Sequence, residues 1–101
     1  MAEARLKLSE LADGSLKAVD LNGEDVVVAR VGDRCYALGG ICPHEGAPLE
    51  DGELDGETLT CPWHFTEFDV TSGKVVDGLT EEPLAVYAVS IDGDDVVVSK
   101  D

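Results

Sequence analysis

The chain of 101 residues contains few basic residues, few aromatic residues and few cysteines. Lys and Arg together number 7 against 22 Asp and Glu, so the formal net charge is −15 at pH 7. Nucleic-acid binding requires clustered Lys and Arg to neutralise phosphates, and an anionic membrane surface attracts the same residues. The charge therefore argues against nucleic acid and against membranes as partners.

Long apolar runs are also absent. No stretch approaches the roughly 20 apolar residues of a transmembrane helix, and the N-terminal residues MAEARLKL lack the apolar core of a signal peptide. We therefore expect a cytoplasmic protein. The cysteines are Cys35, Cys42 and Cys61. An odd number of cysteines without a signal peptide argues against a disulfide framework.

Short β-branched runs separated by turn residues make up most of the chain. Hydrophobic residues reach 44%, which is typical of one globular domain. Asn-Gly and Asp-Gly pairs between such runs predict hairpins with type I′ turns, in which both central residues have positive φ. No window has a helical period, although Ser9 could cap a short turn through Ala12. The fold class is therefore all-β, an antiparallel sandwich or barrel, with turns predicted at Asn22-Gly23, Gly32-Asp33, Asp55-Gly56 and Asp92-Gly93-Asp94.

The middle of the chain differs from the β runs on either side of it. Residues 39 to 73 are loop-like and contain both histidines and two of the three cysteines. We therefore expect a single domain over 1–101, with a scaffold formed by about 1–38 and 74–101. A subdomain inserted into this scaffold would span about 39–73.

Two short motifs in this insertion contain metal-ligating residues. They are Cys42-Pro43-His44 and Cys61-Pro62-Trp63-His64, with 16 residues between His44 and Cys61. Two thiolates and two imidazoles suit a zinc ion or an iron–sulfur centre. Structural zinc sites usually pair two cysteines in one knuckle, whereas here each loop has one Cys and one His. A binuclear cluster could place both thiolates on one iron and both imidazoles on the other.

This pair of motifs resembles the Rieske [2Fe–2S] signature. The likeness continues through Gly46, Pro48, Gly52, Phe68-Asp69, Ser72-Gly73 and Pro83 to the terminal hairpin. It implies a Rieske-type antiparallel β base with an inserted cluster-binding subdomain and one [2Fe–2S] cluster per chain. The resemblance also implies roles for single residues: Cys42 and Cys61 bind the buried iron, His44 and His64 bind the outer iron, and Pro83 lies on a third loop over the cluster. Cys35 matches no ligand position and is expected to be a core thiol.

Several positions depart from the high-potential branch of this family. Ala47 and Trp63 stand where that branch has two cysteines joined by a disulfide. Thr66 and Phe68 stand where it has a serine and a tyrosine that donate hydrogen bonds to the cluster. Phe65 stands where the family as a whole usually has a small residue, often glycine. Fewer donors predict a potential at the low end of the family range of roughly −150 to +300 mV. Trp63 is interpreted as an apolar shield over the cluster or as a partner contact.

The resemblance therefore implies a soluble, monomeric one-electron carrier and not an enzyme. It would pass electrons from an NAD(P)H-dependent flavoprotein reductase to a terminal oxygenase. No Lys or Arg occurs from Cys35 to Gly73, so an acidic surface is expected to attract basic partners. The alternatives are the small Rieske-fold subunit of an assimilatory nitrite reductase and a structural zinc-binding module.

Overall fold

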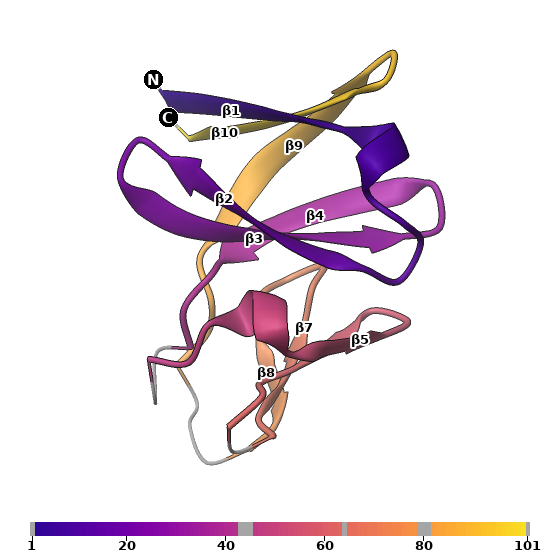
Figure 1. Ribbon diagram of the computed structural model, residues 1–101. Helices are drawn as coiled ribbons and strands as arrows, with labels where there is room; N and C mark the ends of the chain where they lie inside the picture. Colours follow the sequence, from indigo (N-terminus) through magenta and orange to yellow (C-terminus); the bar gives the residue numbers. More distant parts are fainter. Residues whose placement is uncertain (1, 43–45, 64, 79–81, 101) are drawn as a thin grey trace.

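The computed structural model describes residues 2–42, 46–63, 65–78 and 82–100, which form two antiparallel sheets (Figure 1). The larger sheet has the strand order β1-β10-β9-β4-β3-β2, and the smaller has the order β5-β6-β7-β8. The larger sheet contains β1 (Ala2–Lys7), β2 (Leu16–Leu21), β3 (Glu24–Val31), β4 (Arg34–Gly39), β9 (Val86–Asp92) and β10 (Asp95–Lys100). The smaller sheet contains β5 (Glu53–Asp55), β6 (Thr58–Thr60), β7 (Glu67–Asp69) and β8 (Val75–Asp77).

The helical content is limited to two 3₁₀ turns in the part of the chain that the structure describes. They are η1 (Leu8–Glu10) and η2 (Leu49–Asp51). No helix among the described residues is long and apolar enough to cross a bilayer. The prediction of an all-β, antiparallel fold is confirmed.

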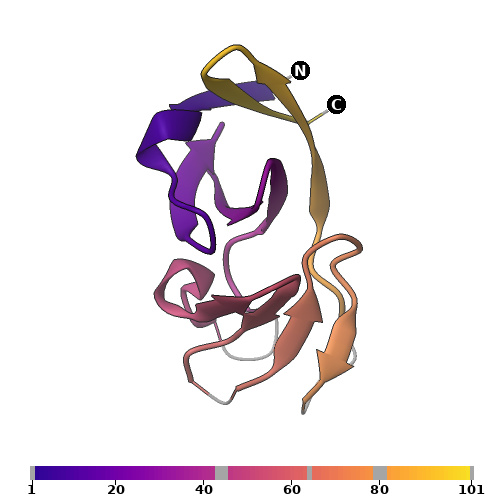
Figure 2. The ribbon, with the colours of Figure 1, turned by 90° about the vertical axis from the view of Figure 1, so that its right-hand side faces the viewer.

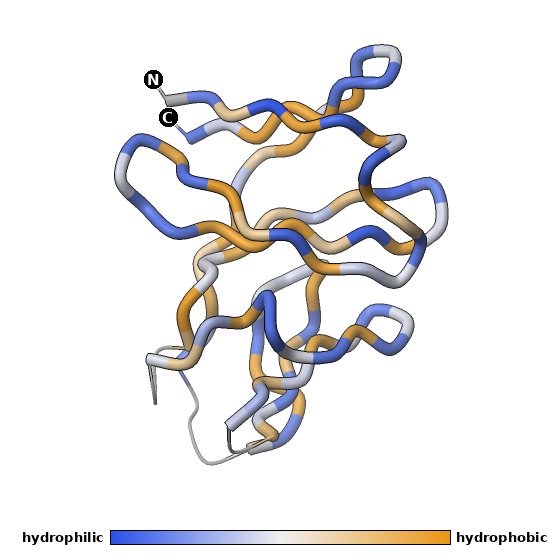
Figure 3. Tube along the Cα trace, in the orientation of Figure 1, coloured by the Kyte–Doolittle hydropathy of each residue, from blue (hydrophilic) through white to orange (hydrophobic). Residues whose placement is uncertain are grey.

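The six-stranded sheet curls into a nearly closed barrel. Its two edge strands, β1 and β2, come into contact across the open side (Figure 2). Hydrophilic residues gather at the hairpin turns of this sheet and alternate with apolar residues along β1 (Figure 3). The smaller sheet forms a second lobe at the end of the barrel away from the chain termini (Figure 1).

Strand β3 separates the two hydrophobic cores. Its four consecutive residues Val26 to Ala29 are completely buried. Val26 and Val28 point into the barrel, whereas Val27 and Ala29 point toward the smaller sheet. Because successive side chains of a strand alternate between faces, an uninterrupted apolar run fits a strand that is buried on both sides.

The hairpins occur where the sequence predicts them, but only one of their turns has the expected backbone. Asn22 and Gly23 both have positive φ, 54° and 90°, as a type I′ turn requires. In the other three hairpins the two-residue loop begins at the glycine, and only Gly32, Gly56 and Gly93 have positive φ. The type I′ prediction is therefore wrong for the two Asp-Gly pairs, because Asp55 and Asp92 are each the last residue of a strand and the loop begins at the glycine.

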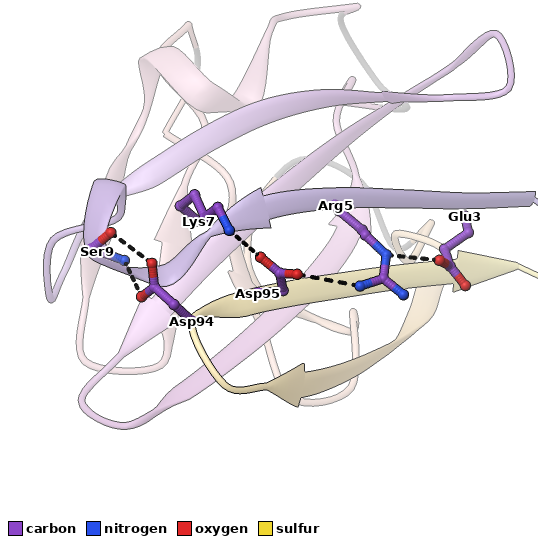
Figure 4. Close-up of polar contacts among 6 residues, drawn as sticks. All are labelled: Glu3, Arg5, Lys7, Ser9, Asp94 and Asp95. Carbon is purple, nitrogen blue, oxygen red and sulfur yellow. Dashed lines mark hydrogen bonds and ion pairs between the residues drawn. The ribbon is translucent and has the colours of Figure 1, made fainter.

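Polar contacts join β1 to β10 along the barrel edge (Figure 4). The Asp95 carboxylate accepts hydrogen bonds from Lys7 Nζ at 2.6 Å and from Arg5 Nη1 at 3.3 Å. The Ser9 hydroxyl and backbone N–H both donate to the carboxylate of Asp94. Ser9 lies inside η1 and does not cap a turn, so the expectation of a Ser9 cap is wrong.

Short backbone contacts connect the two lobes. Leu49 N–H donates to Gly40 O at 2.8 Å, and Leu84 N–H donates to Gly73 O at 2.8 Å. The smaller sheet includes β8, so it extends a few residues past the expected boundary at 73. The division into a scaffold and a cluster-binding subdomain otherwise stays a prediction.

Candidate metal centre

Two loops with the same backbone hydrogen bonds begin at Cys42 and Cys61. In the first loop Gly46 N–H donates to Cys42 O at 2.8 Å, and Cys42 N–H donates to Ala47 O at 2.9 Å. In the second loop Phe65 N–H donates to Cys61 O at 3.2 Å, and Cys61 N–H donates to Thr66 O at 2.8 Å. Each cysteine therefore starts a turn in which the residues four and five positions later bond back to it.

Both turns require a left-handed residue at their fifth position. Gly46 occupies this position in the first loop with φ 75°, and Phe65 occupies it in the second with φ 61°. Glycine adopts this conformation without strain, whereas a side chain with a Cβ is crowded there. Phe65 nevertheless adopts the same left-handed φ region as Gly46.

The two cysteine side chains lie in one buried cluster. Cys42 is 1% exposed and Cys61 is 0% exposed, and both belong to the core that includes Phe68 and Leu59. The three cysteines of the chain form no disulfide. Two buried thiols at the starts of matching loops suit a thiophilic metal centre, because a buried thiolate requires a nearby positive charge.

Thr66 supplies a second indication of a bound group. Its side chain is completely buried, and Oγ1 has no hydrogen-bond partner among the described residues. A buried hydroxyl without a partner is unfavourable by about 1–3 kcal/mol, so such groups usually face an acceptor. A sulfur of a [2Fe–2S] cluster held by Cys61 would supply that acceptor, and the residues present therefore fit this group.

The other two predicted ligands, His44 and His64, lie outside the described residues. Among the residues that the structure does describe, no group of three His, Cys, Asp or Glu side chains could hold a metal ion. The assignment of the four ligands therefore stays a prediction. Two of these ligands, Cys42 and Cys61, lie among the described residues.

The remaining predicted site residues have different surroundings. Phe68 is completely buried in the cysteine-containing core, where its ring can donate no hydrogen bond. Trp63 is 54% exposed, so neighbouring residues cover less than half of its surface. Pro83 is exposed on the loop before β9, and its role over the cluster stays a prediction.

Cys35 faces away from the two loops. It lies on β4 and packs inside the barrel with Ala37, whereas Leu38 on the opposite face of β4 packs with Cys42. Burial raises the pKa of the Cys35 thiol, and nearby Arg30 partly opposes that shift. Cys35 is thus a buried thiol of the barrel core.

Two glycines, Gly52 and Gly78, lie in close contact with residues next to or within the second loop. A Cβ at Gly52 would collide with the carbonyl oxygen of Thr60, the residue before Cys61. A Cβ at Gly78 would lie 2.7 Å from Thr66 Oγ1. These glycines allow the chain to approach the second loop closely. A glycine in a turn-rich sequence gives no signal that separates this role from ordinary turn formation.

Comparison with known proteins identifies the family. The Rieske [2Fe–2S] domain model matches residues 4–100. The chain belongs to the Rieske [2Fe–2S] domain family. Its predicted resemblance to this family is thus confirmed, together with the Rieske-type fold and the [2Fe–2S] cofactor that members of the family carry.

Ferredoxin components are among the similar Rieske proteins. The chain is 30% identical over 91 residues to the ferredoxin component of a naphthalene 1,2-dioxygenase system from Pseudomonas aeruginosa, a match that covers 90% of this chain and 88% of that protein. The solved ferredoxin of carbazole 1,9a-dioxygenase from Nocardioides aromaticivorans is 32% identical, with a TM-score of 0.94 and complete coverage of both chains.

Two further solved Rieske structures bear on the choice of partner. A ferredoxin seen in complex with the oxygenase of carbazole 1,9a-dioxygenase is 32% identical, with a TM-score of 0.87 over 92% of this chain and 96% of that one. A putative NADH-dependent nitrite reductase small subunit from Mycobacterium tuberculosis is 20% identical, with a TM-score of 0.88 over 99% of this chain and 96% of that one. The latter likeness shows only a shared fold.

Proposed function

We propose that this Rieske protein is a one-electron carrier, the ferredoxin component of an oxygenase system, and not itself an enzyme. The observation that carries the proposal is the pair of matching loops, which bury Cys42 and Cys61 in one core. The whole-length similarity to dioxygenase ferredoxins supports the same role. We further propose that Cys42, Cys61, His44 and His64 hold the cluster.

When bound, the cluster takes up and releases one electron at a time. The chain controls how readily this occurs through its donor set and the groups around it. Two thiolates and two neutral imidazoles contribute less negative charge than four thiolates, so reduction is easier than in an all-cysteine site. The Thr66 hydroxyl would donate a hydrogen bond that favours the more negative, reduced form, whereas Phe68 offers no donor.

The described part of the smaller lobe is strongly acidic, which favours binding of redox partners with basic surfaces. Between residues 39 and 78 the only basic residue is Lys74. Hydrogen bonds from the Thr71 hydroxyl and N–H lower the pKa of Asp69 and keep that carboxylate ionised. The described acidic residues of the lobe are Glu50, Asp51, Glu53, Asp55, Glu57, Glu67, Asp69 and Asp77.

We therefore propose two partners, each with a basic docking surface. An NAD(P)H-dependent flavoprotein reductase would supply the electron, and a terminal oxygenase would accept it. The complex of a related ferredoxin with an oxygenase supports the second partner. We also propose that the chain acts as a monomer in the cytoplasm, since its surface charge favours separation of copies.

An anaerobic titration tests the carrier role. Dithionite should deliver one electron per chain and bleach the visible absorption, and air should restore it. NADH with the flavoprotein reductase of a naphthalene 1,2-dioxygenase system should produce the same reduced spectrum. A chain that takes up no electron from dithionite would contradict the proposal.

The nitrite reductase alternative predicts a different outcome. A small subunit of that enzyme would form a stable complex with a large catalytic subunit, whereas a carrier would remain separable and turn over repeatedly. Catalytic amounts of the chain should therefore support many cycles of electron transfer from reductase to acceptor. Transfer that stops after one electron per chain would instead favour the subunit.

A further inference from the structure

Phe65 has a backbone conformation that its side chain does not favour. Its φ of 61° lies in the left-handed region, and it is one of only two non-glycine residues with positive φ in the described part of the chain. The equivalent position of the first loop has glycine, Gly46, with φ 75°. The turn thus works with glycine in this chain, and the ring of Phe65 is not needed to form it.

The Phe65 side chain gains little from the rest of the protein. It is 70% exposed, the most exposed of the large hydrophobic side chains described. A strained residue normally persists because burial or hydrogen bonding compensates for its conformation, and strained positions cluster at functional sites. Burial of the Phe65 ring within this chain does not provide such compensation.

Phe65 is also fixed close to the candidate metal centre. Its N–H donates to Cys61 O at 3.2 Å, and the next residue is the buried Thr66. Trp63, two positions earlier, is 54% exposed. The second loop therefore presents two exposed aromatic side chains within four residues of a predicted cluster ligand.

We propose that Phe65 is the anchor residue with which this protein docks on its redox partner. Its ring would enter an apolar recess at the partner's electron-transfer port, and basic side chains around that recess would face the acidic lobe. Aromatic side chains that become fully buried on binding dominate the energetics of many interfaces. This inference rests on the proposed carrier function and adds the residue and the kind of surface that it recognises.

Charge complementarity selects this occupant over a second copy of the chain. Eight described acidic residues and one lysine lie between residues 39 and 78. Two such lobes brought together would repel each other, whereas a basic rim would be attracted. Self-association through Phe65 is therefore an outcome that would overturn the proposal.

The test compares substitutions that leave the backbone conformation in place. Asparagine tolerates the left-handed region better than other non-glycine residues, so Phe65→Asn removes the ring and retains the turn. Phe65→Leu keeps an apolar side chain. Ile91→Asn is the matched control, because Ile91 is 44% exposed on β9 of the other sheet, far along the chain from the loops.

The probe is cytochrome c, which offers an exposed apolar haem edge among lysine side chains. The reduced protein should donate to it with a KM that rises about tenfold in Phe65→Asn, which corresponds to losing the burial of one apolar side chain. Phe65→Leu should lie between Phe65→Asn and wild type, and Ile91→Asn should match wild type. The reduction potential and visible spectrum should be the same in all four proteins.

Several results would overturn the proposal. Equal KM values for wild type and Phe65→Asn would remove the anchor role, and a shifted potential would show that Phe65 acts on the cluster instead. A concentration-dependent dimer that Phe65→Asn abolishes would assign the surface to self-association. Failure of the carrier function itself would appear differently, because the wild-type protein would then pass no electrons to cytochrome c after dithionite treatment.

Discussion

Gly46 and Phe65 occupy the same position in two matching turns. Introducing glycine at 65 and removing it at 46 should therefore change the free energy of unfolding in opposite directions. Phe65→Gly relieves the left-handed strain of a residue with a Cβ and should stabilise the protein by about 1 kcal/mol. Gly46→Ala introduces the same strain and should destabilise it by about as much. For a domain of this size, each change corresponds to a shift in Tm of about 4–8 °C. Circular dichroism melting of the cluster-loaded protein measures the two shifts in Tm. A fall in Tm for Phe65→Gly would show that the ring stabilises the fold.

Thr66 is the residue most directly linked to the potential. Its buried Oγ1 lacks a partner among the described residues, so a donor role toward the cluster predicts that Thr66→Val lowers the potential. One hydrogen bond of about 1 kcal/mol corresponds to a decrease of about 40–50 mV for a one-electron couple. Thr66→Ser, which keeps the hydroxyl, should remain near the wild-type value. Protein-film voltammetry distinguishes the two, and equal potentials for Val and Ser would remove the donor role.

Among the elements, the close approach of the η2–β5 connection to β6 fixes the second loop. Gly52 has no room for a Cβ against the Thr60 carbonyl, so Gly52→Ala should force these segments apart. Overpacking of this kind destabilises proteins by about 1–3 kcal/mol, and the loss should include faster release of the cluster. Gly39→Ala is the control, because its Cβ would lie 3.7 Å from Ala85 N, an ordinary contact. Loss of visible absorption on incubation with a chelator gives the rate of cluster release in each variant. Equal rates for Gly52→Ala and Gly39→Ala would contradict a role for the Gly52 contact.

The β1–β10 edge should contribute stability that depends on pH. A hydrogen bond and the positive charge of Lys7, followed by the charge of Arg5, hold the pKa of Asp95 below its usual value. A lowered pKa in the folded state means that the contribution is complete above the unfolded pKa of about 3.9 and is lost as the pH falls through the folded pKa.

The Tm difference between wild type and Lys7→Gln should therefore be present at neutral pH and narrow in acid. Lys17→Gln is the matched control, since it removes the same charge from a looser pair with Glu10 at 3.8 Å. Its Tm difference should be smaller at neutral pH. A Lys7→Gln difference that widens as the pH falls would contradict the assigned sign.

Some structural features of this protein can be predicted from its sequence and others cannot. The hairpins follow from local turn chemistry, and the burial of β3 on both faces agrees with its uninterrupted apolar run. The exact turn register does not follow, because an aspartate before a glycine can end a strand or enter the loop. The motif predicts Cys42 and Cys61. The burial of the Thr66 hydroxyl without a partner among the described residues, and the crowding at Gly52, depend instead on contacts between segments that are distant in sequence.

Across the whole molecule, charge is distributed unevenly between the two lobes. Six of the seven basic residues lie in the part of the chain that forms the barrel, and only Lys74 lies in the smaller lobe. Electron transfer to cytochrome c should therefore slow steeply as ionic strength rises, since salt screens the attraction at distances beyond about 8–10 Å. Stopped-flow mixing at increasing salt measures this. A rate that does not change with salt would remove steering by the acidic lobe.

The central claim, that two cysteines and two histidines of this chain hold a one-electron Rieske cluster, has one direct test. The chain contains only two histidines, so ¹⁵N-histidine labelling marks His44 and His64 and nothing else. Pulsed EPR of the dithionite-reduced protein should show one unpaired spin per chain, coupled to two labelled nitrogens. A reduced protein without such a spin, or with a spin coupled to no histidine nitrogen, would contradict the assignment.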